Sequence, residues 1–486
     1  MASRESEQPN LLFILSDDQG AWAMGCAGNE ELQTPNLNRL ASTGIRFDNF
    51  FCASPVCSPA RASILTGQIP SQHGVQDFLR EGNHPNLPND GREIQYLAGK
   101  KAYVTVLAAN GYDCGLSGKW HLGKSTLPQL GFAYWNAHAA GGGPYYGAPM
   151  VINEEFKKEE RYVTDVITDN AISYLETIVD TDNPFCLNVH YTAPHAPWNR
   201  SNHPKESFSS YYDSCPFDSV PWEETHPYQL NKESGAAIIG NNEPSRREAL
   251  SGYFSAITEM DRNIGRLIDW LEENCLRENT LLVFSSDNGM NMGHHGIWGK
   301  GNGTYPPNMY DTATKVPTII SRPGHVPQDL VCDKLLSQYD FFPTLLSYLG
   351  IPESGEENLP GRDFSPLLFG QALNNEDIVY ILDEYGPTRM IRSRNWKYVH
   401  RFLNGSNEFY DLVRDPEETV NMVTAPHLQD RISNMASDLK NWYEKYVDPT
   451  MDGTLQFVTG TGQLDIISAS EKPFADDVVF FTEDNR

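Results

Sequence analysis

The stretch N-L-L-F-I-L-S-D-D, residues 10–18, is a mainly apolar run that ends abruptly in two carboxylates. A continuous run of this kind, without alternating polar residues, is typical of a strand that is buried on both faces. The stretch T-L-L-V-F-S-S-D-N-G, residues 280–289, has the same form. We therefore predict two buried strands, and each of them ends in side chains that carry oxygen.

The chain around these strands alternates between strand and helix patterns. Repeated strand-helix-strand units predict a large, mostly parallel sheet that is sandwiched by helices. The long helix is expected to carry Ile257, Asp261, Ile264 and Ile268 on one stripe. The further predicted elements are a helix in 34–44 with Thr34 as its N-terminal cap, a helix at 103–111, a strand from 185 that runs into a Pro-rich loop, and the long helix at 254–271.

The C-terminal quarter of the chain has a different pattern. We predict an α/β domain over residues 1–372 and a smaller α+β subdomain over 373–486, with a short antiparallel sheet and one packed helix. Residues 450–465 and 476–484 fit neither part clearly. Three roles remain open for these two segments: they wrap the body, line a pocket or join subunits.

Composition limits the partners of the chain. The 486 residues include 37 basic and 64 acidic ones, which gives a formal net charge of −27. Such an excess of acid argues against nucleic acid and against an anionic membrane surface as partners. The chain has no apolar run of membrane-spanning length, and its first residues are too polar for a signal peptide. We expect a cytoplasmic protein, unless an export signal has been removed.

The ends of the two buried strands predict a metal site. In parallel sheets, ligands collect at the carboxyl ends of the strands. Asp17, Asp18, Asp287 and Asn288 are therefore expected to meet over one sheet edge. Donor sets made only of oxygen suit Ca²⁺ or Mg²⁺ rather than zinc. Each dipeptide alone is also typical of an ordinary turn, which is the alternative interpretation.

The segment P-V-C-S-P-A-R-A-S-I-L-T-G, residues 55–67, predicts a short helix with Pro59 in its first turn and Gly67 as its stop. Cys57 then lies at the positive end of the helix, where a thiol loses its proton more readily. Arg61 follows one turn later. Two alternatives for Cys57 are a packing cysteine and a bridge to Cys52. The eight cysteines are dispersed, which favours reduced thiols over a disulfide framework.

Residues 57–67 resemble the signature of the type I sulfatases, members of the alkaline phosphatase superfamily, in which the cysteine of C-x-[PA]-x-R is oxidised after translation to formylglycine. Other segments of the chain resemble landmarks of the same family, and the likeness extends to about residue 445. These segments are I-L-S-D-D-Q-G (14–20), S-G-K-W-H-L-G (117–123), T-A-P-H-A-P (192–197), F-S-S-D-N-G (284–289), H-H-G-I-W-G-K-G (294–301), 337–352 and 409–423.

The resemblance implies a sulfuric ester hydrolase that converts R–O–SO₃ to alcohol and inorganic sulfate. In the family, formylglycine is hydrated, one hydroxyl attacks sulfur while the alcohol leaves, and the other hydroxyl expels sulfate as the aldehyde re-forms. Cys57 is then the precursor of the nucleophile, and a formylglycine-generating enzyme is an implied partner. Asp17, Asp18, Asp287 and Asn288, together with modified residue 57, would bind one divalent cation, with Ca²⁺ favoured and Mg²⁺ as the alternative.

The resemblance also assigns roles to charged residues. Arg61 would steady the hydrate, and Lys119 and Lys300 would grip the sulfate oxygens. His121 would stabilise or deprotonate the hydrate, and His195 would protonate or hydrogen-bond the leaving oxygen.

These assignments have alternatives in the sequence itself. His195 can be an ordinary residue of a Pro-rich loop. Lys119 and His121, two positions apart, can project from one solvated face of a strand. Lys300 is followed by a longer loop than in many relatives, so that Lys315 is a substitute candidate.

Two loops are candidates for the part of the site that selects the substrate. The loop G-G-G-P-Y-Y-G at 141–147 and the insert from 200 to about 245 are candidates for substrate contact, although their aromatic residues could equally serve loop packing. Their polarity fits a carbohydrate sulfate better than a lipid-like one. We expect the substrate to be a small-molecule or oligosaccharide sulfate ester, either a sulfated carbohydrate or an aryl sulfate. The alternative functions are a formylglycine-dependent phosphonate monoester hydrolase or phosphodiesterase, and a non-catalytic relative that binds sulfated glycans. Homo-oligomer formation remains open.

Overall fold

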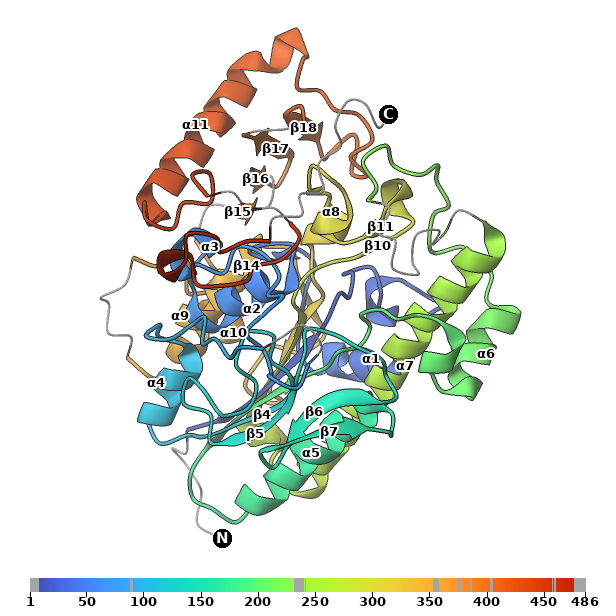
Figure 1. The fold of residues 1–486 in the computed structure, drawn as a ribbon, viewed down its shortest axis with the longest axis vertical. Helices are drawn as coiled ribbons and strands as arrows, with labels where there is room; N and C mark the ends of the chain where they lie inside the picture. The colour runs from blue at the N-terminus through green and yellow to red at the C-terminus, as the bar shows by residue number, and fades with distance from the viewer. Residues whose placement is uncertain are drawn as a thin grey trace.

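A ten-stranded mixed sheet forms the centre of the larger part of the protein (Figure 1). The computed structural model describes residues 8–87, 91–230, 240, 242–352, 358–374, 377–384, 387–402, 405–456, 458 and 460–475. The strand order is β13-β2-β12-β9-β1-β8-β4-β5-β6-β7. The strands are β1 Asn10–Ser16, β2 Ile45–Phe47, β4 Asp113–Lys119, β5 Tyr134–His138, β6 Ala148–Ile152, β7 Glu155–Glu159, β8 Phe185–His190, β9 Thr280–Ser286, β12 Thr318–Ser321 and β13 Leu330–Cys332.

The central strands β9, β1, β8, β4 and β5 are parallel. Strand β1 lies in the middle, and every one of its residues is buried. Leu12 pairs with Leu187 of β8 on one side and with Leu282 of β9 on the other. The predicted strands at 10–16 and 280–286 are therefore confirmed, and their apolar runs are continuous because both faces of the sheet are covered.

Helices cover the two faces of this sheet (Figure 1). Because side chains alternate along a strand, Phe13 packs in the cluster of α2, α4 and α9, whereas Ile14 packs with α1, α5 and α7. The predicted sandwich is confirmed. The helices are α1 Pro35–Ser42, α2 Cys57–Thr66, α3 Pro70–His73, α4 Tyr103–Ala109, α5 Val163–Ile178, α6 Lys205–Ser214, α7 Glu243–Glu273, α8 Asp311–Thr314, α9 Phe341–Tyr348 and α10 Ser365–Leu368.

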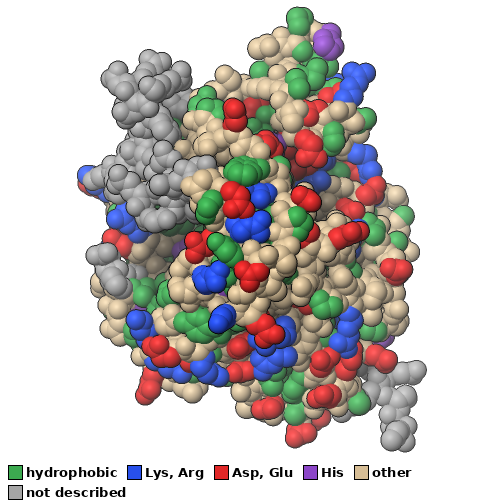
Figure 2. Space-filling view, turned by 90° about the vertical axis from the view of Figure 1, so that its right-hand side faces the viewer, with side chains coloured by type: hydrophobic (Ala, Val, Ile, Leu, Met, Phe, Trp, Pro, Cys, Tyr) green, Lys and Arg blue, Asp and Glu red, His purple; other side chains and the backbone are tan. Residues whose placement is uncertain are grey.

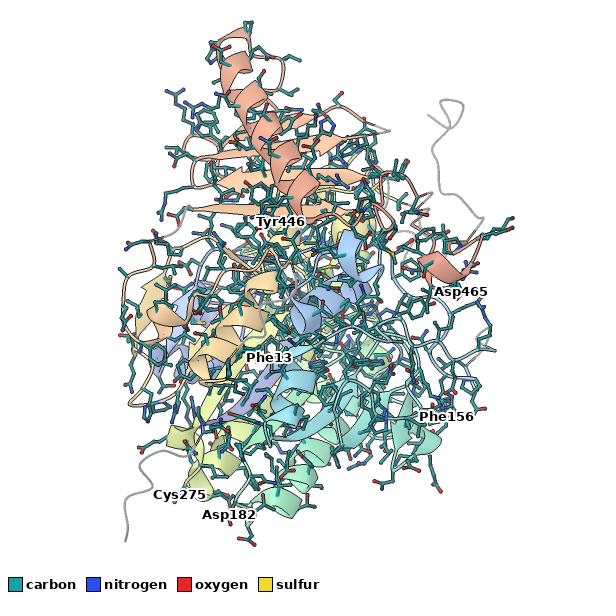
Figure 3. All side chains as sticks on the ribbon, turned by 90° about the vertical axis from the view of Figure 1, so that its left-hand side faces the viewer. Phe13, Phe156, Asp182, Cys275, Tyr446 and Asp465 are labelled. Atoms are coloured by element: carbon teal, nitrogen blue, oxygen red, sulfur yellow. The ribbon has the colours of Figure 1, made fainter. Side chains whose placement is uncertain are left out.

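A second, antiparallel sheet follows in the chain. It contains β15 (Ile378–Asp383), β16 (Thr388–Ser393), β17 (Trp396–Arg401) and β18 (Glu408–Asp411). Helix α11 (Gln429–Tyr446) packs on one face, and Figure 3 shows its C-terminal end at Tyr446 next to the larger part of the protein. The other face packs against Phe51 and Met309. The predicted small sheet and its helix are confirmed, whereas the boundary after residue 372 stays a prediction.

The surface carries a mixture of charges. On the face that Figure 2 shows, basic and acidic side chains are interspersed with scattered apolar ones. Within the described residues, none of the helices combines the length and the apolar character that crossing a membrane requires. All eight cysteines are free thiols, so that neither the bridge between Cys52 and Cys57 nor any other disulfide forms. This arrangement agrees with the prediction of reduced cysteines.

The N-terminus of α1 is capped by a residue of another helix. The predicted cap, Thr34, makes no capping hydrogen bond, because its Oγ1 accepts instead from Gly25 N at 2.8 Å. Buried Asp261 of α7 accepts from Leu37 N at 2.7 Å and from Asn36 N at 3.0 Å. Burial raises the pKa of Asp261 to about 6, although these bonds oppose the shift. The carboxylate thus accepts hydrogen bonds from N–H groups in the first turn of α1, which a capping side chain next to the helix would otherwise accept.

We expect Asp261→Ala to lower the free energy of unfolding by about 2 kcal/mol, because it leaves two helix N–H groups buried without an acceptor. A matched control is Asp269→Ala. Asp269 also joins α7 to α1, through Arg39 at 2.7 Å, but its side chain is 58% exposed. Exposed ion pairs contribute about 0.2–1 kcal/mol. Urea unfolding of both variants measures the difference, and equal losses would contradict the capping role.

Candidate active site

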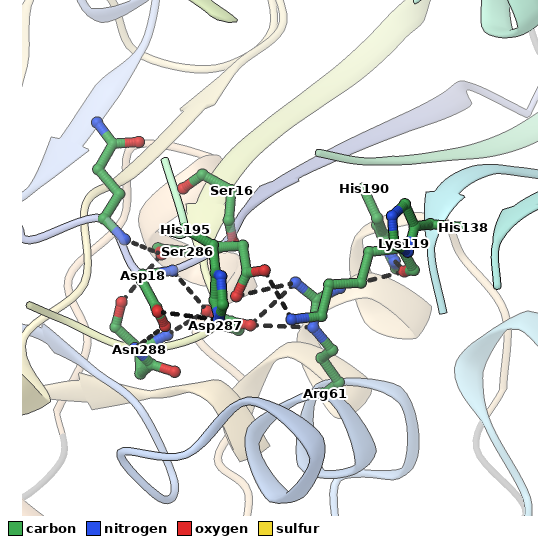
Figure 4. A network of polar contacts seen from close by, with 12 residues as sticks. Ser16, Asp18, Arg61, Lys119, His138, His190, His195, Ser286, Asp287 and Asn288 are labelled. Carbon is green, nitrogen blue, oxygen red and sulfur yellow. Dashed lines mark hydrogen bonds and ion pairs between the residues drawn. The ribbon is translucent and has the colours of Figure 1, made fainter. Parts of the chain in front are cut away.

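The predicted oxygen cluster forms where β1 and β9 end. Ser16 and Ser286 are register partners in these parallel strands, so that Asp17 and Asp287 follow side by side. Asp18 N donates to Asp287 Oδ1 at 3.1 Å, and Asn288 Nδ2 donates to Asp18 Oδ1 at 2.8 Å (Figure 4). All four predicted side chains are buried. The expected meeting of the two strand ends is therefore observed.

Helix α2 brings Cys57 and Arg61 to this cluster. The helix begins at Cys57 and ends at Thr66, and Gly67 caps it with a φ of 69°, in the left-handed region that glycine tolerates. Arg61 donates through Nε to Asp287 Oδ2 at 2.9 Å and through Nη1 to Lys119 O at 3.2 Å. Burial raises the pKa of the Cys57 thiol, but Lys300 and Lys119 outweigh it and leave the pKa below its usual value.

Two lysines complete the charged cluster. Lys119, the last residue of β4, donates from Nζ to Asp17 Oδ2 at 2.6 Å. Lys300 follows the short strand β11 (Trp298–Gly299) and donates to Asp18 Oδ1 at 2.6 Å. Burial lowers the pKa of Lys300, but Asp18 and other anionic groups raise it above its usual value. Lys315, the substitute candidate, instead pairs with Asp311 at 3.2 Å. The structure therefore favours Lys300.

The two predicted histidines have different hydrogen-bond partners. His195 Nε2 is 3.7 Å from Asp18 Oδ2, and its Nδ1 bonds Ala196 O at 2.7 Å. His121 bonds Leu79 O through Nε2 at 3.2 Å. It does not share a strand face with Lys119, since β4 ends at Lys119 and His121 has a φ of 52°. That alternative interpretation is wrong. Burial lowers the pKa of both imidazoles, which favours their neutral forms.

Some buried oxygen atoms of the cluster accept no hydrogen bond. Asp17 Oδ1 and Asn288 Oδ1 are buried without a hydrogen-bond donor. Burial also raises the pKa of Asp17 well above its usual value, despite the nearby Lys119 ammonium. Ligand atoms of Asp17, Asp18 and His195 lie within 4.8 Å of one another. Unsatisfied buried oxygens are costly, and a hard divalent cation would satisfy them. The side chains of this site therefore fit such an ion.

Two residues that hold the site were not among the predicted ones. His190 Nδ1 bonds Lys119 O at 3.1 Å, and Gln338 Nε2 donates to Asp287 O at 2.7 Å. His190 is the last residue of β8, next to β1, so that its position at a strand end could have indicated it. Gln338 lies in the recognised segment 337–352, but nothing local in the sequence shows that it contacts Asp287.

The loop at 141–143 packs its backbone against the catalytic candidates. A Cβ atom on Gly141 would lie 2.1 Å from His121 Nε2, and one on Gly142 would lie 2.9 Å from His195 Cε1. On Gly143 it would make only ordinary contacts, at 3.5 Å. The consecutive glycines therefore allow a close approach to two imidazoles that no side chain would permit.

We expect Gly141→Ala to lower kcat by about 10- to 100-fold, because the new methyl group must displace His121 from its position. Gly143→Ala is the matched control and should stay within about twofold of the native kcat. Steady-state kinetics on an aryl sulfate, with thermal unfolding of each variant, make the comparison. Equal kcat values for the two variants would show that the close packing is unimportant.

The aromatic residues of the insert from 200 to about 245 divide into two groups. Tyr211 and Phe217 are buried in a cluster with α7, which agrees with ordinary packing. Trp222 is 55% exposed, with the Arg246 guanidinium 5.4 Å from its ring centroid. Residues 231–239 and 241 lie outside the described part of the chain. The insert thus retains an exposed aromatic side chain, and its contact with substrate stays a prediction.

Comparisons with known proteins agree with this architecture. An N-acetylglucosamine-6-O-sulfatase of Bacteroides thetaiotaomicron is 26% identical, over 92% of this chain and 88% of its own. A structure solved with its substrate D-glucosamine-2-N,6-O-disulfate shares the fold at a TM-score of 0.76 and 23% identity, over 93% of this chain and all of its own. A phosphonate monoester hydrolase of Agrobacterium radiobacter also shares the fold, with a TM-score of 0.65 and 21% identity. The match covers 90% of this chain and 96% of the hydrolase.

The sequence matches the models of two protein families. Residues 293–445 match the C-terminal part of N-sulphoglucosamine sulphohydrolase. Residues 9–351, which include the strand ends, α2 and both lysines of the cluster, match the family described as Sulfatase. The chain therefore belongs to the type I sulfatases of the alkaline phosphatase superfamily, and it is a sulfuric ester hydrolase.

Proposed function

We propose that this sulfatase hydrolyses a sulfate ester of a carbohydrate, and that it does so through a formylglycine formed from Cys57. The observation that carries the proposal is the convergence of Cys57, Arg61, Lys119 and Lys300 on one buried cluster of carboxylates. Fixed cations beside a nucleophile stabilise the negative charge that gathers on the oxygens of a sulfate ester. Hydrated formylglycine would supply the nucleophilic hydroxyl.

The cationic side chains have separate tasks in this proposal. Lys119 and Lys300 bind sulfate oxygens, since both ammonium groups are held in place by carboxylates at 2.6 Å. Arg61 keeps α2 and residue 57 against the site through its bonds to Asp287. Asp17, Asp18, Asp287 and Asn288, with residue 57, hold one divalent cation, Ca²⁺ first and Mg²⁺ as the alternative. Such an ion would supply Lewis-acid stabilisation of the sulfate oxygens.

Hydrogen bonding sets which nitrogen of each histidine exchanges a proton. A carbonyl oxygen only accepts, so Leu79 O requires a hydrogen on His121 Nε2, and Ala196 O requires one on His195 Nδ1. The other ring nitrogens are His121 Nδ1, which is buried without a hydrogen-bond partner, and His195 Nε2, which lies 3.7 Å from Asp18 Oδ2. We assign His121 Nδ1 to take a proton from the nucleophile. To act as an acid, His195 must be the imidazolium, with hydrogens on both nitrogens; Asp18, 3.7 Å from Nε2, favours this form against the effect of burial. We assign protonated His195 Nε2 to give its proton to the leaving oxygen.

The carbohydrate part of the proposal is supported by the relatives. The N-acetylglucosamine-6-O-sulfatase acts on an amino sugar sulfate, and the solved neighbour holds a disulfated glucosamine. We expect a panel of sulfated sugars and steroids to give the largest kcat/KM with a sulfated hexosamine. A steroid sulfate as the best substrate of the panel would overturn the carbohydrate assignment and leave the sulfatase assignment intact.

The phosphonate monoester hydrolase among the structural neighbours gives a second candidate function. Rates on an aryl sulfate and an aryl phosphodiester, measured on one sample, separate the two. We expect kcat/KM to favour the sulfate by about 100-fold or more, which corresponds to about 3 kcal/mol of transition-state stabilisation. The mass of the peptide that contains residue 57 gives the extent of conversion by a formylglycine-generating enzyme. A higher rate on the phosphodiester would favour the second function.

A further inference from the structure

The last described segment of the chain pairs with residues beside the active site. Residues 460–465, here called the tail segment, lie along residues 74–80, which follow α3 (Figure 1). Gln463 N donates to Phe78 O at 2.8 Å, and Arg80 N donates to Gln463 O at 3.0 Å. Of the three roles left open for residues 450–465, wrapping the body is therefore observed. Residues 476–484 lie outside the described part of the chain.

The side chain of Gln463 is the centre of this pairing. It is fully buried, its Oε1 accepts from Gln76 N at 2.9 Å, and its Nε2 donates to Gly74 O at 3.0 Å. The same Nε2 donates to Asp465 O at 3.0 Å, which fixes the bend of the tail segment itself. Buried backbone groups without partners are costly, so the amide of Gln463 fixes the path of residues 74–76.

Residues 74–80 in turn contact the catalytic candidates through Leu79. Leu79 O accepts the hydrogen bond from His121 Nε2 at 3.2 Å. Leu79 N donates to Ser58 Oγ at 3.1 Å, and Ser58 lies in the first turn of α2, next to Cys57. A single residue therefore supports both the imidazole and the helix that carries residue 57. Its own position depends on the pairing with Gln463 on the neighbouring segment.

We propose that Gln463 is a positioning residue of the active site, which acts through Leu79 O to keep His121 in the form with a free Nδ1. This inference rests on the proposed role of His121. Without the amide, Gly74 O and Gln76 N lose their buried partner, whereas the backbone bonds of Gln463 to Phe78 and Arg80 remain. Residues 74–76 then shift, the shift carries Leu79 O with it, and the imidazole loses its fixed orientation. Lys119 and Lys300 contact Asp17 and Asp18 rather than this segment, so that sulfate binding remains. The loss therefore falls on kcat rather than on KM.

The first test is Gln463→Met, which fills the same buried volume without hydrogen bonds. We expect kcat to fall by about 10- to 100-fold while KM stays within about threefold. Gln429→Met is the matched control: its amide also donates to two carbonyls, Val423 O at 2.9 Å and Ala425 O at 3.1 Å, but it is exposed, at the first residue of α11. The control should keep the native kcat. Rates are expressed per chain that carries formylglycine, and circular dichroism monitors the fold.

A double-mutant cycle with His121→Ala separates action through this imidazole from a general loss of structure. We expect Gln463→Met to change kcat by less than about twofold when His121 is already alanine. If Gln463→Met lowers kcat by the same factor with His121 and with alanine at position 121, the inference is overturned. It is also overturned if Gln463→Met has the native kcat while His121→Ala has a lowered one. A native kcat in His121→Ala would instead overturn the proposed role of His121.

A milder substitution serves if Gln463→Met does not fold. Asp77 Oδ2 accepts from Gly462 N at 3.1 Å, so that Asp77→Asn weakens the same pairing from the other side. It should lower kcat by a smaller factor, again without a change in KM and again only while His121 is present. An effect of Asp77→Asn that persists in His121→Ala would overturn the inference.

Discussion

Replacing Cys57 with alanine is expected to lower turnover of an aryl sulfate by at least about 1,000-fold, because position 57 supplies the nucleophile. The fold should persist. Cys57 is buried at the first turn of α2, and alanine removes only its sulfur from a helix that Arg61 anchors to Asp287. The thermal midpoint should therefore change little. The measurement is kcat on the purified variant together with its unfolding curve.

Cys52 provides the matched control for this result. It is a buried, free thiol in the same stretch of chain, but burial raises its pKa well above the usual value, in contrast to Cys57. Cys52→Ala should keep kcat within about twofold of native. Turnover by Cys57→Ala at the native rate would exclude the nucleophile assignment. If the native protein binds a sulfated sugar and never cleaves it, the non-catalytic alternative is correct instead.

Removal of divalent cations should have the second largest effect. We expect a chelator to lower kcat by about 100-fold or more, and added Ca²⁺ to restore it, because a bound cation contributes several kcal/mol to stabilisation of the reacting oxygens. The buried acceptors Asp17 Oδ1 and Asn288 Oδ1 have no donor of their own, which is the structural basis of the prediction. Dialysis, metal addition and kinetics test it.

Stability gives an independent measure of the same site. A ligand that binds the folded state alone stabilises it by about 2.7 kcal/mol at 100 times its Kd, so that Ca²⁺ should raise the thermal midpoint. Asp17→Asn should abolish this rise, whereas Asp269→Asn, at an exposed carboxylate of α7, should keep it. A rise that survives in Asp17→Asn would place the cation elsewhere. The same measurement of the thermal midpoint with Mg²⁺ in place of Ca²⁺ compares the two candidate ions.

Much of the site could be predicted because its information is local. The apolar runs before Asp17 and Asp287 define parallel strands, and parallel strands bring their carboxyl ends to one edge. The helix that begins at Cys57 follows from Pro59 and Gly67 in the same way. The resemblance to the sulfatases then connected these segments with Lys119 and Lys300, whose charges alone would fit any solvated surface.

The sequence by itself thus determined the strands, the helix of residue 57 and the family. Only the tertiary structure showed that Lys300 and not Lys315 contacts the acidic cluster, that His121 lies beyond the strand of Lys119, and that Asp261 rather than Thr34 caps α1. It also revealed Gln463 beside residues 74–80. The physical reason is that strand and helix patterns arise within a few residues, whereas these contacts join groups far apart in the chain. Their partners are selected by the geometry of the folded sheet, which no local pattern records.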